Sequence, residues 1–135
     1  MILKILLDTN FLMIPAQFGI DIFKEIDRLI SRKFKLIIFQ GIIDELKVLL
    51  QSSVKKQKEV QIALELTKRC EKIDLNSDKI TGQTIDDKIF QLATSNRWIV
   101  ATNDRKLRKK LRAHQVPVIT LRKKAYLIIE GDFSS

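Results

Sequence analysis

Cysteine and histidine are almost absent: the chain has one of each, Cys70 and His114, among 135 residues. An internal disulfide is therefore excluded, and no Cys/His cluster is available for a zinc site. The sequence also lacks any apolar run near the roughly 18 residues of a membrane span. Its apolar start has no basic leader. We therefore expect a cytoplasmic protein that has no membrane partner. Because repeats, linkers and low-complexity segments are missing too, we expect one domain over residues 1–135.

Acidic residues are scarce in the last third of the chain. The net charge is +9 and the pI is near 9.8, and most of the excess is found between Asp104 and Lys124. Nine basic residues face one acid there. Such a block is typical of a protein that binds a polyanion, and nucleic acid fits better than a merely solvated helix face. The nine are Arg105, Lys106, Arg108, Lys109, Lys110, Arg112, Arg122, Lys123 and Lys124.

Short aliphatic runs alternate with amphipathic stretches along the whole chain. The pattern predicts an α/β fold with a doubly wound, mainly parallel sheet of four to five strands and helices on both faces. Pro15 is interpreted as the end of the first segment, and residues 76–83 are predicted to be a polar loop. Strands are predicted at 1–7, 35–39, 72–75, 97–101 and 116–121, with 126–129 as an edge strand or tail, and helices at 21–32, 41–50, 55–70, 84–95 and 105–113.

Four carboxylates are predicted to meet at one end of this sheet. Asp8 and Asp104 directly follow strands, whereas Glu45 and Asp86 lie in the opening turns of helices. Each has an ordinary alternative role, as a turn or cap residue or as a complement to the helix dipole. Together, however, they would raise one another's pKa values unless a cation were present. Oxygen ligands of this kind suit Mg²⁺ or Mn²⁺.

Helical spacing predicts different roles for two adjacent acids at the start of helix 84–95. Asp86 continues the buried face of Ile89, Phe90 and Ala93, so we assign the chemistry to it. Asp87 stands three residues after Thr84, which is the capping-box spacing, so we assign it to capping or to a supporting role.

An acidic metal pocket beside a basic surface favours metal-dependent hydrolysis of phosphodiester bonds, since cations stabilise the phosphate while Lys and Arg hold the strand. The sequence also resembles the PIN-domain nucleases over essentially its whole length. The resemblance is carried, in order, by "LLDTNFLMIP", "GIIDEL", "TIDDKIFQLA", and "WIVATNDRKLRKKL" with "VPVITL". Within that family it is most similar to the branch that processes ribosomal RNA in the small-subunit pathway.

The resemblance implies a Rossmann-like fold and an endoribonuclease that uses Mg²⁺ or Mn²⁺. It implies that Asp8, Glu45, Asp86 and Asp104 are the catalytic and metal-binding quartet, and that Thr9, Asn10 and Thr102 orient the acids. Asp8, Asp86 and Asp104 are the expected metal ligands, with Glu45 as a ligand or as the group that orients the attacking water. The helix after Asp104 is expected to grip the RNA through Arg105, Lys106, Arg108, Lys109 and Arg112.

Other functions remain open at this stage. Toxin-type PIN ribonucleases share these acids and are regulated by an antitoxin, and the ribosomal branch usually carries extensions that this chain lacks. A non-catalytic RNA-binding module for ribosome assembly is the alternative from another class. A response-regulator receiver is disfavoured, because Thr102-Asn103-Asp104 stands where a receiver needs a lysine. The expected partner is ribosomal or pre-ribosomal RNA, and a homodimer through the apolar face of helix 55–70 is a further expectation.

Overall fold

A computed structural model describes residues 2–75 and 84–133, so Met1 and the predicted loop 76–83 lie outside the described residues. Strands and helices alternate along the chain as predicted. The strands are β1 (Leu3–Leu7), β2 (Phe34–Phe39), β3 (Glu71–Ile73), β4 (Ile99–Ala101), β5 (Val118–Arg122) and β6 (Tyr126–Glu130). The helices are α1 (Thr9–Leu12), α2 (Ile14–Phe18), α3 (Ile22–Leu29), α4 (Gln40–Ser52), the 3-10 turn η1 (Val54–Lys56), α5 (Gln57–Thr67), α6 (Ile85–Asn96) and α7 (Arg105–Ala113).

The strands form one sheet in the order β3-β2-β1-β4-β5-β6. The first five strands are parallel, and β6 pairs antiparallel with β5. The central strand β1 is aliphatic, and Ile5, Leu6 and Leu7 are fully buried. This is the expected composition of a strand that is covered on both faces of a parallel sheet. The predicted α/β class and doubly wound, mainly parallel sheet are therefore confirmed, with six strands instead of four to five.

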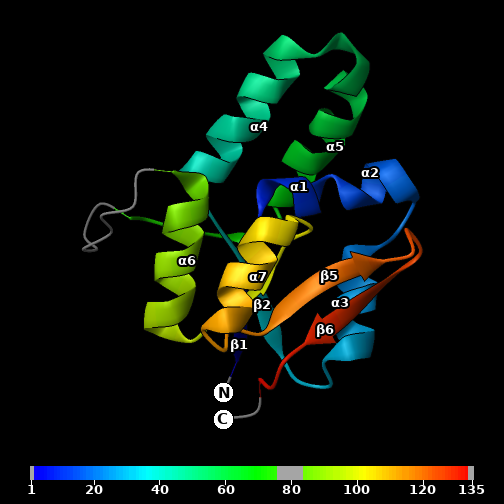
Figure 1. The fold of residues 1–135 in the computed structure, drawn as a ribbon. Helices are drawn as coiled ribbons and strands as arrows, with labels where there is room; N and C mark the ends of the chain where they lie inside the picture. The colour runs from blue at the N-terminus through cyan, green and yellow to red at the C-terminus, as the bar shows by residue number, and fades with distance from the viewer. Residues whose placement is uncertain (1, 76–83, 134–135) are drawn as a thin grey trace.

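The chain reverses direction across the sheet at β1. From β1 it proceeds to β2 and β3 on one side, and then crosses to β4 and β5 on the other. Because such crossovers are right-handed, helices before and after the reversal cover opposite faces. In Figure 1, α6 and α7 lie in front of the sheet and α3 lies behind it. The packed pair α4 and α5 extends beyond the sheet as a helical hairpin.

Several local predictions were wrong. The segment around Pro15 is helical, because Pro15 stands in the first turn of α2, where proline needs no N–H partner. Strand β4 begins two residues later than predicted, since Arg97 ends α6 in a left-handed conformation with φ 57°. The proposed dimer face of helix 55–70 is covered within the chain: Val60 and Ala63 are fully buried, and α5 packs on α1, α2 and α4. The homodimer itself stays a prediction.

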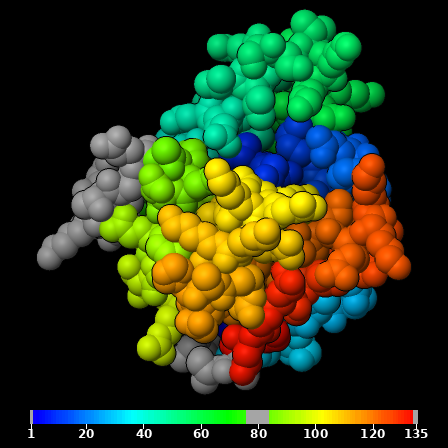
Figure 2. All heavy atoms as spheres, viewed as in Figure 1, coloured from blue at the N-terminus to red at the C-terminus, as the bar shows by residue number. Residues whose placement is uncertain are grey.

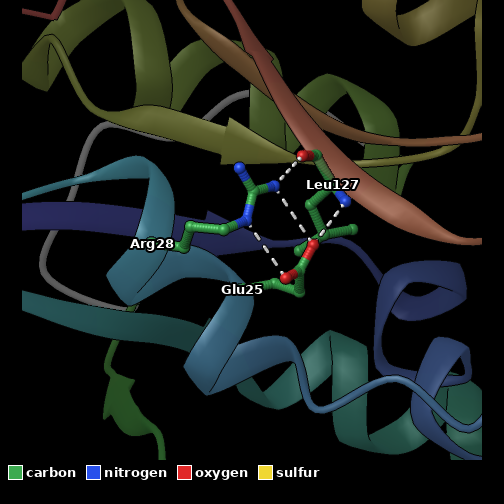
Figure 3. A network of polar contacts seen from close by, with 3 residues as sticks. All are labelled: Glu25, Arg28 and Leu127. Atoms are coloured by element: carbon green, nitrogen blue, oxygen red, sulfur yellow. Dashed lines mark hydrogen bonds and ion pairs between the residues drawn. The ribbon is translucent and has the colours of Figure 1, made fainter.

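The outer edge of β6 is closed by side chains of α3. Leu127 donates its backbone N–H to Glu25 Oε1 at 2.9 Å, and its carbonyl accepts from Arg28 at 2.8 Å. Glu25 and Arg28 also pair with each other at 3.2 Å (Figure 3). These contacts satisfy backbone groups that an edge strand would otherwise leave open to another strand. We call these three residues the edge clasp.

Within residues 2–75 and 84–133, no helix is long and apolar enough to cross a bilayer.

Candidate active site

Asp8 lies where the direction of the chain reverses, directly after β1 and beside β4. In an open α/β sheet the crevice beyond the strand ends at this point is the usual ligand site. Asp8 is 5% exposed, and each of its carboxylate oxygens accepts one hydrogen bond. The backbone N–H of Thr9 donates to Oδ1 at 2.8 Å, and the Thr102 hydroxyl donates to Oδ2 at 2.7 Å. The carboxylate is therefore held in one orientation by the ends of two strands.

The loop after β4 holds Asp104 in a similarly fixed position. The Thr102 oxygen accepts the Asp104 N–H at 3.0 Å, so one hydroxyl contacts both acidic residues. Asp104 caps α7, and its Oδ1 accepts the N–H groups of Lys106 and Leu107 at 2.9 and 3.1 Å. Among the described residues, nothing donates to Asp104 Oδ2, which leaves this oxygen for another ligand.

Asn103 ties this loop to the neighbouring strand ends. Its backbone N–H donates to Asn10 Oδ1 at 3.2 Å, and its own Oδ1 accepts the Leu121 N–H at 3.0 Å. Asn10 therefore joins the ends of β1 and β4 through its side chain and does not contact an acid in this way. The Thr9 side chain is different again, because its buried hydroxyl has no hydrogen-bond partner among the described residues.

Glu45 and Asp86 reach the same place from two helices. Glu45 lies in the second turn of α4, and Asp86 lies in the first turn of α6. The two helix starts approach each other at Gly41, where an added Cβ would lie 2.7 Å from Ile85 Cδ1, so a larger residue there would require the Ile85 side chain to move.

Asp86 and Asp87 differ in position, although Asp86 is exposed and does not continue the buried face as predicted, whereas Asp87 is half-buried. Asp86 lines the cleft described below, whereas Asp87 is absent from its lining. The Thr84 hydroxyl accepts the Asp87 N–H at 3.0 Å, so Thr84 is the cap of α6.

All four predicted acids line one cleft of about 300 Å³, here called the acidic cleft. Figure 2 shows the dark blue start of the chain at the surface between α4, α6 and α7. A larger cavity of about 550 Å³ has Asp132 as the only acid in its lining, so chemistry and not size identifies the candidate site. The acidic cleft is lined by Asp8, Thr9, Asn10, Met13, Gln17, Glu45, Leu49, Lys56, Asp86 and Asp104.

The acids of this cleft influence one another. Burial raises the pKa of Asp8 to about 6, with smaller contributions from Asp86 and Glu45, although the bonds from Thr102 and Thr9 oppose the shift. Desolvation also raises the pKa of Asp86, followed by the charges of Asp104, Glu45 and Asp87, while Lys110 lowers it. The folded chain thus holds carboxylates together at an electrostatic cost, which a bound cation would offset.

The donor set of the cleft fits a hard divalent cation. Carboxylate oxygens are its preferred ligands, and Mg²⁺ needs few of them because it keeps several waters. The buried Thr9 hydroxyl of the same cleft has no partner within the described part of the chain, and an ordered water would satisfy it. No three acidic, histidine or cysteine side chains of the described residues already surround one ion position. Water-bridged ligands or a rotation of the exposed Glu45 and Asp86 would complete such a site.

The five predicted RNA-binding residues of α7 divide into two groups. Arg108 forms an ion pair with Glu130 of β6 at 2.9 Å, and Arg112 donates to the carbonyl of Val116, in the connection between α7 and β5, at 3.1 Å, so both already have partners within the chain. Arg105, Lys106 and Lys109 are exposed. Only Arg105 and Lys106 belong to the first turn, next to the cleft.

Some residues of the cleft were missed from the sequence. Lys56 follows Val54 and Lys55 in a turn outside every motif, and only the α4–α5 hairpin brings it to the acids. Asn103 was noted between Thr102 and Asp104, but its bonds to Asn10 and Leu121 depend on the neighbouring strands. The "TND" trio after a buried strand was the available signal.

Comparisons with known proteins agree with this fold. The family model described as "PIN like domain" matches residues 5–124. Ribonuclease VapC4 of Methanocaldococcus jannaschii is 37% identical over 132 residues, covering 95% of this chain and 97% of that protein. The PIN domain endonuclease Utp24 superposes with a TM-score of 0.77 at 25% identity, covering 95% of this chain and 91% of that one.

A further solved structure supports the fold alone. It is VapBC2 from Rickettsia felis bound to a DNA fragment from their promoter, with a TM-score of 0.63 at 17% identity, covering 89% of this chain and 100% of that one. The family match covers nearly all of β1 to β5 and includes all four acids of the cleft. This chain therefore belongs to the PIN like domain family.

Proposed function

We propose that this chain is a divalent-metal-dependent endoribonuclease that hydrolyses RNA phosphodiester bonds. The observation that carries the proposal is the convergence of Asp8, Glu45, Asp86 and Asp104 on one cleft at the reversal point of the sheet. A relative named as a ribonuclease and a solved neighbour named as an endonuclease support it. The basic charge of the chain supports a polyanionic substrate.

The proposed roles follow from how each acid is held. Asp8 and Asp104 are fixed by hydrogen bonds, and with Asp86 they would hold Mg²⁺ or Mn²⁺. Such an ion would lower the pKa of a water nucleophile and stabilise charge on the phosphate. Glu45, exposed at the rim, would act as a further ligand or orient the attacking water. Thr102 fixes Asp8 and Asp104 relative to each other through its single hydroxyl.

The supporting cations lie on both sides of the acids. Lys56 lines the cleft from the α4–α5 hairpin, and Arg105 and Lys106 stand in the first turn of α7. We assign these three to phosphates that flank the cut bond, because Arg108 and Arg112 already have partners within the chain. Of the five RNA-binding residues predicted on α7, this proposal keeps Arg105 and Lys106 and adds Lys56 from outside the helix.

The test is cleavage of labelled single-stranded and structured RNA in Mn²⁺, in Mg²⁺ and in EDTA. Asp86→Asn and Asp87→Asn form a matched pair, since the residues are adjacent and only Asp86 lines the cleft. We expect Asp86→Asn to reduce cleavage by at least about a hundredfold, and Asp87→Asn to stay within a few-fold of wild type. Equal losses in both variants, or cutting that survives EDTA, would contradict the assignment. RNA binding without any cutting would favour an assembly module.

Two biological settings remain as proposals. We place the enzyme in ribosomal RNA processing in the cytoplasm, because its motifs resemble those of the PIN branch that processes ribosomal RNA in the small-subunit pathway. The second candidate is a toxin-type ribonuclease with an antitoxin partner, favoured by the relative named VapC4. Expression of wild type and Asp8→Asn separates them. A toxin would arrest growth only with Asp8 intact, whereas a processing enzyme would leave growth unchanged and alter ribosomal RNA precursors.

A further inference from the structure

The turn that joins β5 to β6 carries three consecutive cations. Arg122, Lys123 and Lys124 are all exposed, and Ala125 closes the turn by donating its N–H to the Arg122 carbonyl at 3.1 Å. Within residues 2–75 and 84–133, none of the three side chains forms an ion pair. We call residues 122–125 the basic turn. Three adjacent unpaired cations repel one another, so the fold gains nothing from their charge.

The backbone of the basic turn does not suit lysine. Lys123 and Lys124 have φ values of 56° and 54°, the pattern of a type I′ turn in which both central residues are left-handed. Asn-Gly is the favoured pair in such turns, because other side chains meet a steric cost there. Charge and conformation both disfavour Lys-Lys for stability. A local choice that costs stability in two ways points to a function for these side chains.

The basic turn and the acidic cleft both lie at the carboxyl ends of the parallel strands. Strand β5 is parallel to β4 and β1, so its carboxyl end and theirs point the same way. Neighbouring strands are about 4.8 Å apart, which places β5 about 10 Å across the sheet from β1. Asn103 links the two places directly, because it bonds Asn10 on one side and Leu121, next to the turn, on the other.

Helix α7 runs away from the carboxyl ends of the strands, whereas the basic turn lies at the carboxyl end of β5. The helix begins beside the cleft at Arg105 and runs back to the opposite edge, where β5 starts. Its later cations are therefore further from the acids, and Arg108 and Arg112 are already bound within the chain. In Figure 1 the turn between β5 and β6 projects to the right of α7, beyond the sheet. Its exposed cations therefore lie at the carboxyl end of β5, on the same side of the sheet as Arg105 and Lys106 at the start of α7.

An exposed aromatic ring follows the cations immediately. Tyr126 is 37% exposed and is paired in register with Arg122. Cations that contact phosphates, combined with an aromatic ring on which a base stacks, are the usual elements of single-strand recognition.

We propose that the basic turn and Tyr126 form a second contact for single-stranded RNA, in which Arg122, Lys123 and Lys124 bind phosphates and Tyr126 stacks on a base. The inference rests on the proposed ribonuclease function and adds the path that the RNA takes over the surface. From the acidic cleft the RNA passes the first turn of α7 and continues across the end of β5. The contact lies a few nucleotides from the cut bond, so it affects the affinity for longer RNA and not the chemistry.

The test replaces Lys123→Asn and Lys124→Gly together, because this pair removes both charges and suits the type I′ turn. We expect an unchanged or higher Tm, which excludes loss of the fold. Binding of fluorescent single-stranded RNA is measured in EDTA with oligonucleotides of about 4 and about 16 nucleotides. Affinity for the longer RNA should fall roughly tenfold, and the slope of log K against log salt should drop by about 1.4. The shorter RNA should bind as it does to wild type.

The matched control removes two exposed lysines at the opposite edge of the sheet, Lys33→Ala with Lys35→Ala, which should leave both affinities unchanged. Tyr126→Leu should weaken binding of the longer RNA about fivefold or more, and Tyr126→Phe should retain it. If wild type cuts RNA but the turn variant binds the longer RNA normally, the second contact is wrong and the ribonuclease function stands. If wild type neither binds nor cuts RNA, the proposed function itself fails.

Discussion

The acidic cleft and the edge clasp shift the pKa values of their carboxylates in opposite directions. In the clasp, the hydrogen bond from Arg28 and then that from the Leu127 N–H lower the pKa of Glu25. In the cleft, burial raises the pKa of Asp8 to about 6, and neighbouring acids add to the shift. The clasp holds its own cation within hydrogen-bond distance. The cleft holds several acids together, and neither Lys56, which lines it, nor Lys110, which lowers the pKa of Asp86, forms an ion pair with them among the described residues.

This difference distinguishes a paired carboxylate from an unpaired one. A carboxylate that stabilises the fold is paired, as Glu25 is, and its ionisation favours folding. A buried carboxylate without a cation, such as Asp8, is costly to ionise, and a shift of this kind is typical of groups at functional sites, which agrees with the role proposed above. The first kind closes a sheet edge, and the second stands at the mouth of the crevice. Three substitutions test this contrast, and the largest effect is expected in the cleft.

Asp8→Asn should stabilise the metal-free protein at neutral pH. The folded-state pKa of about 6 exceeds the ordinary value of 3.8, so between these values the folded chain binds more protons than the unfolded chain. Stability therefore falls as pH rises through this window, by about 3 kcal/mol at pH 7 if the whole shift is realised. Asparagine removes this cost. Urea denaturation in EDTA should show a gain of about 1–3 kcal/mol at pH 7 and almost none near pH 4.

Adding Mn²⁺ to wild type and to Asp8→Asn provides a control for this experiment. Mn²⁺ should raise the Tm of wild type and leave that of Asp8→Asn unchanged, because binding to the folded state alone stabilises it. A variant that is less stable than wild type at pH 7 in EDTA would show that the buried carboxylate is already compensated, and the contrast with the clasp would disappear.

Thr102→Val should weaken the site while preserving the shape of the core. Thr102 is fully buried, and its hydroxyl donates to Asp8 and accepts from Asp104. Groups that orient ligands in this way typically contribute 10- to 100-fold, so a loss of roughly that size is expected in Mn²⁺ affinity by calorimetry and in cleavage. Thr94→Val is the matched control, since that hydroxyl bonds only to carbonyls of its own helix. Equal effects in the two variants would remove the positioning role.

The convergence of the four acids could be predicted because sheet geometry determines it. Asp8 and Asp104 follow buried strands, and parallel strands place their carboxyl ends together whatever the loops do. The choice of Asp86 over Asp87 needed helical spacing and the Thr84 cap alone. These are local rules, and the structure brings all four acids to one cleft, although Asp86 is exposed and does not continue the buried face of its helix.

Features that depend on distant partners could not be predicted. Nothing in the run Arg105 to Arg112 reveals that Arg108 pairs with Glu130, 22 residues later, because this contact needs the antiparallel return of β6. The sequence therefore predicted the same RNA-binding role for all the cations of this helix, although two of its arginines, Arg108 and Arg112, already bind groups within the chain. The helical segment at Pro15 was missed for another reason: proline was interpreted as a stop, although the first turn of a helix accepts it.

Glu25→Gln should have the smallest effect and should act on stability alone. The glutamine oxygen can still accept the Leu127 N–H, so the change removes the attraction of the charge to exposed Arg28 and the hydrogen bond that Arg28 Nε donates to the second oxygen at 3.2 Å. Because the pKa of Glu25 is lowered, its contribution is present above the ordinary value of 4.5 and is lost as pH falls below it. We expect Tm to decrease by roughly 2–4 °C at pH 7 in low salt and by less in high salt or acid. RNA cleavage should be unchanged, since the clasp lies on the outer edge of β6. A loss of cleavage at unchanged Tm would mean that the two carboxylate environments are coupled, and the division between structural and functional acids would no longer hold.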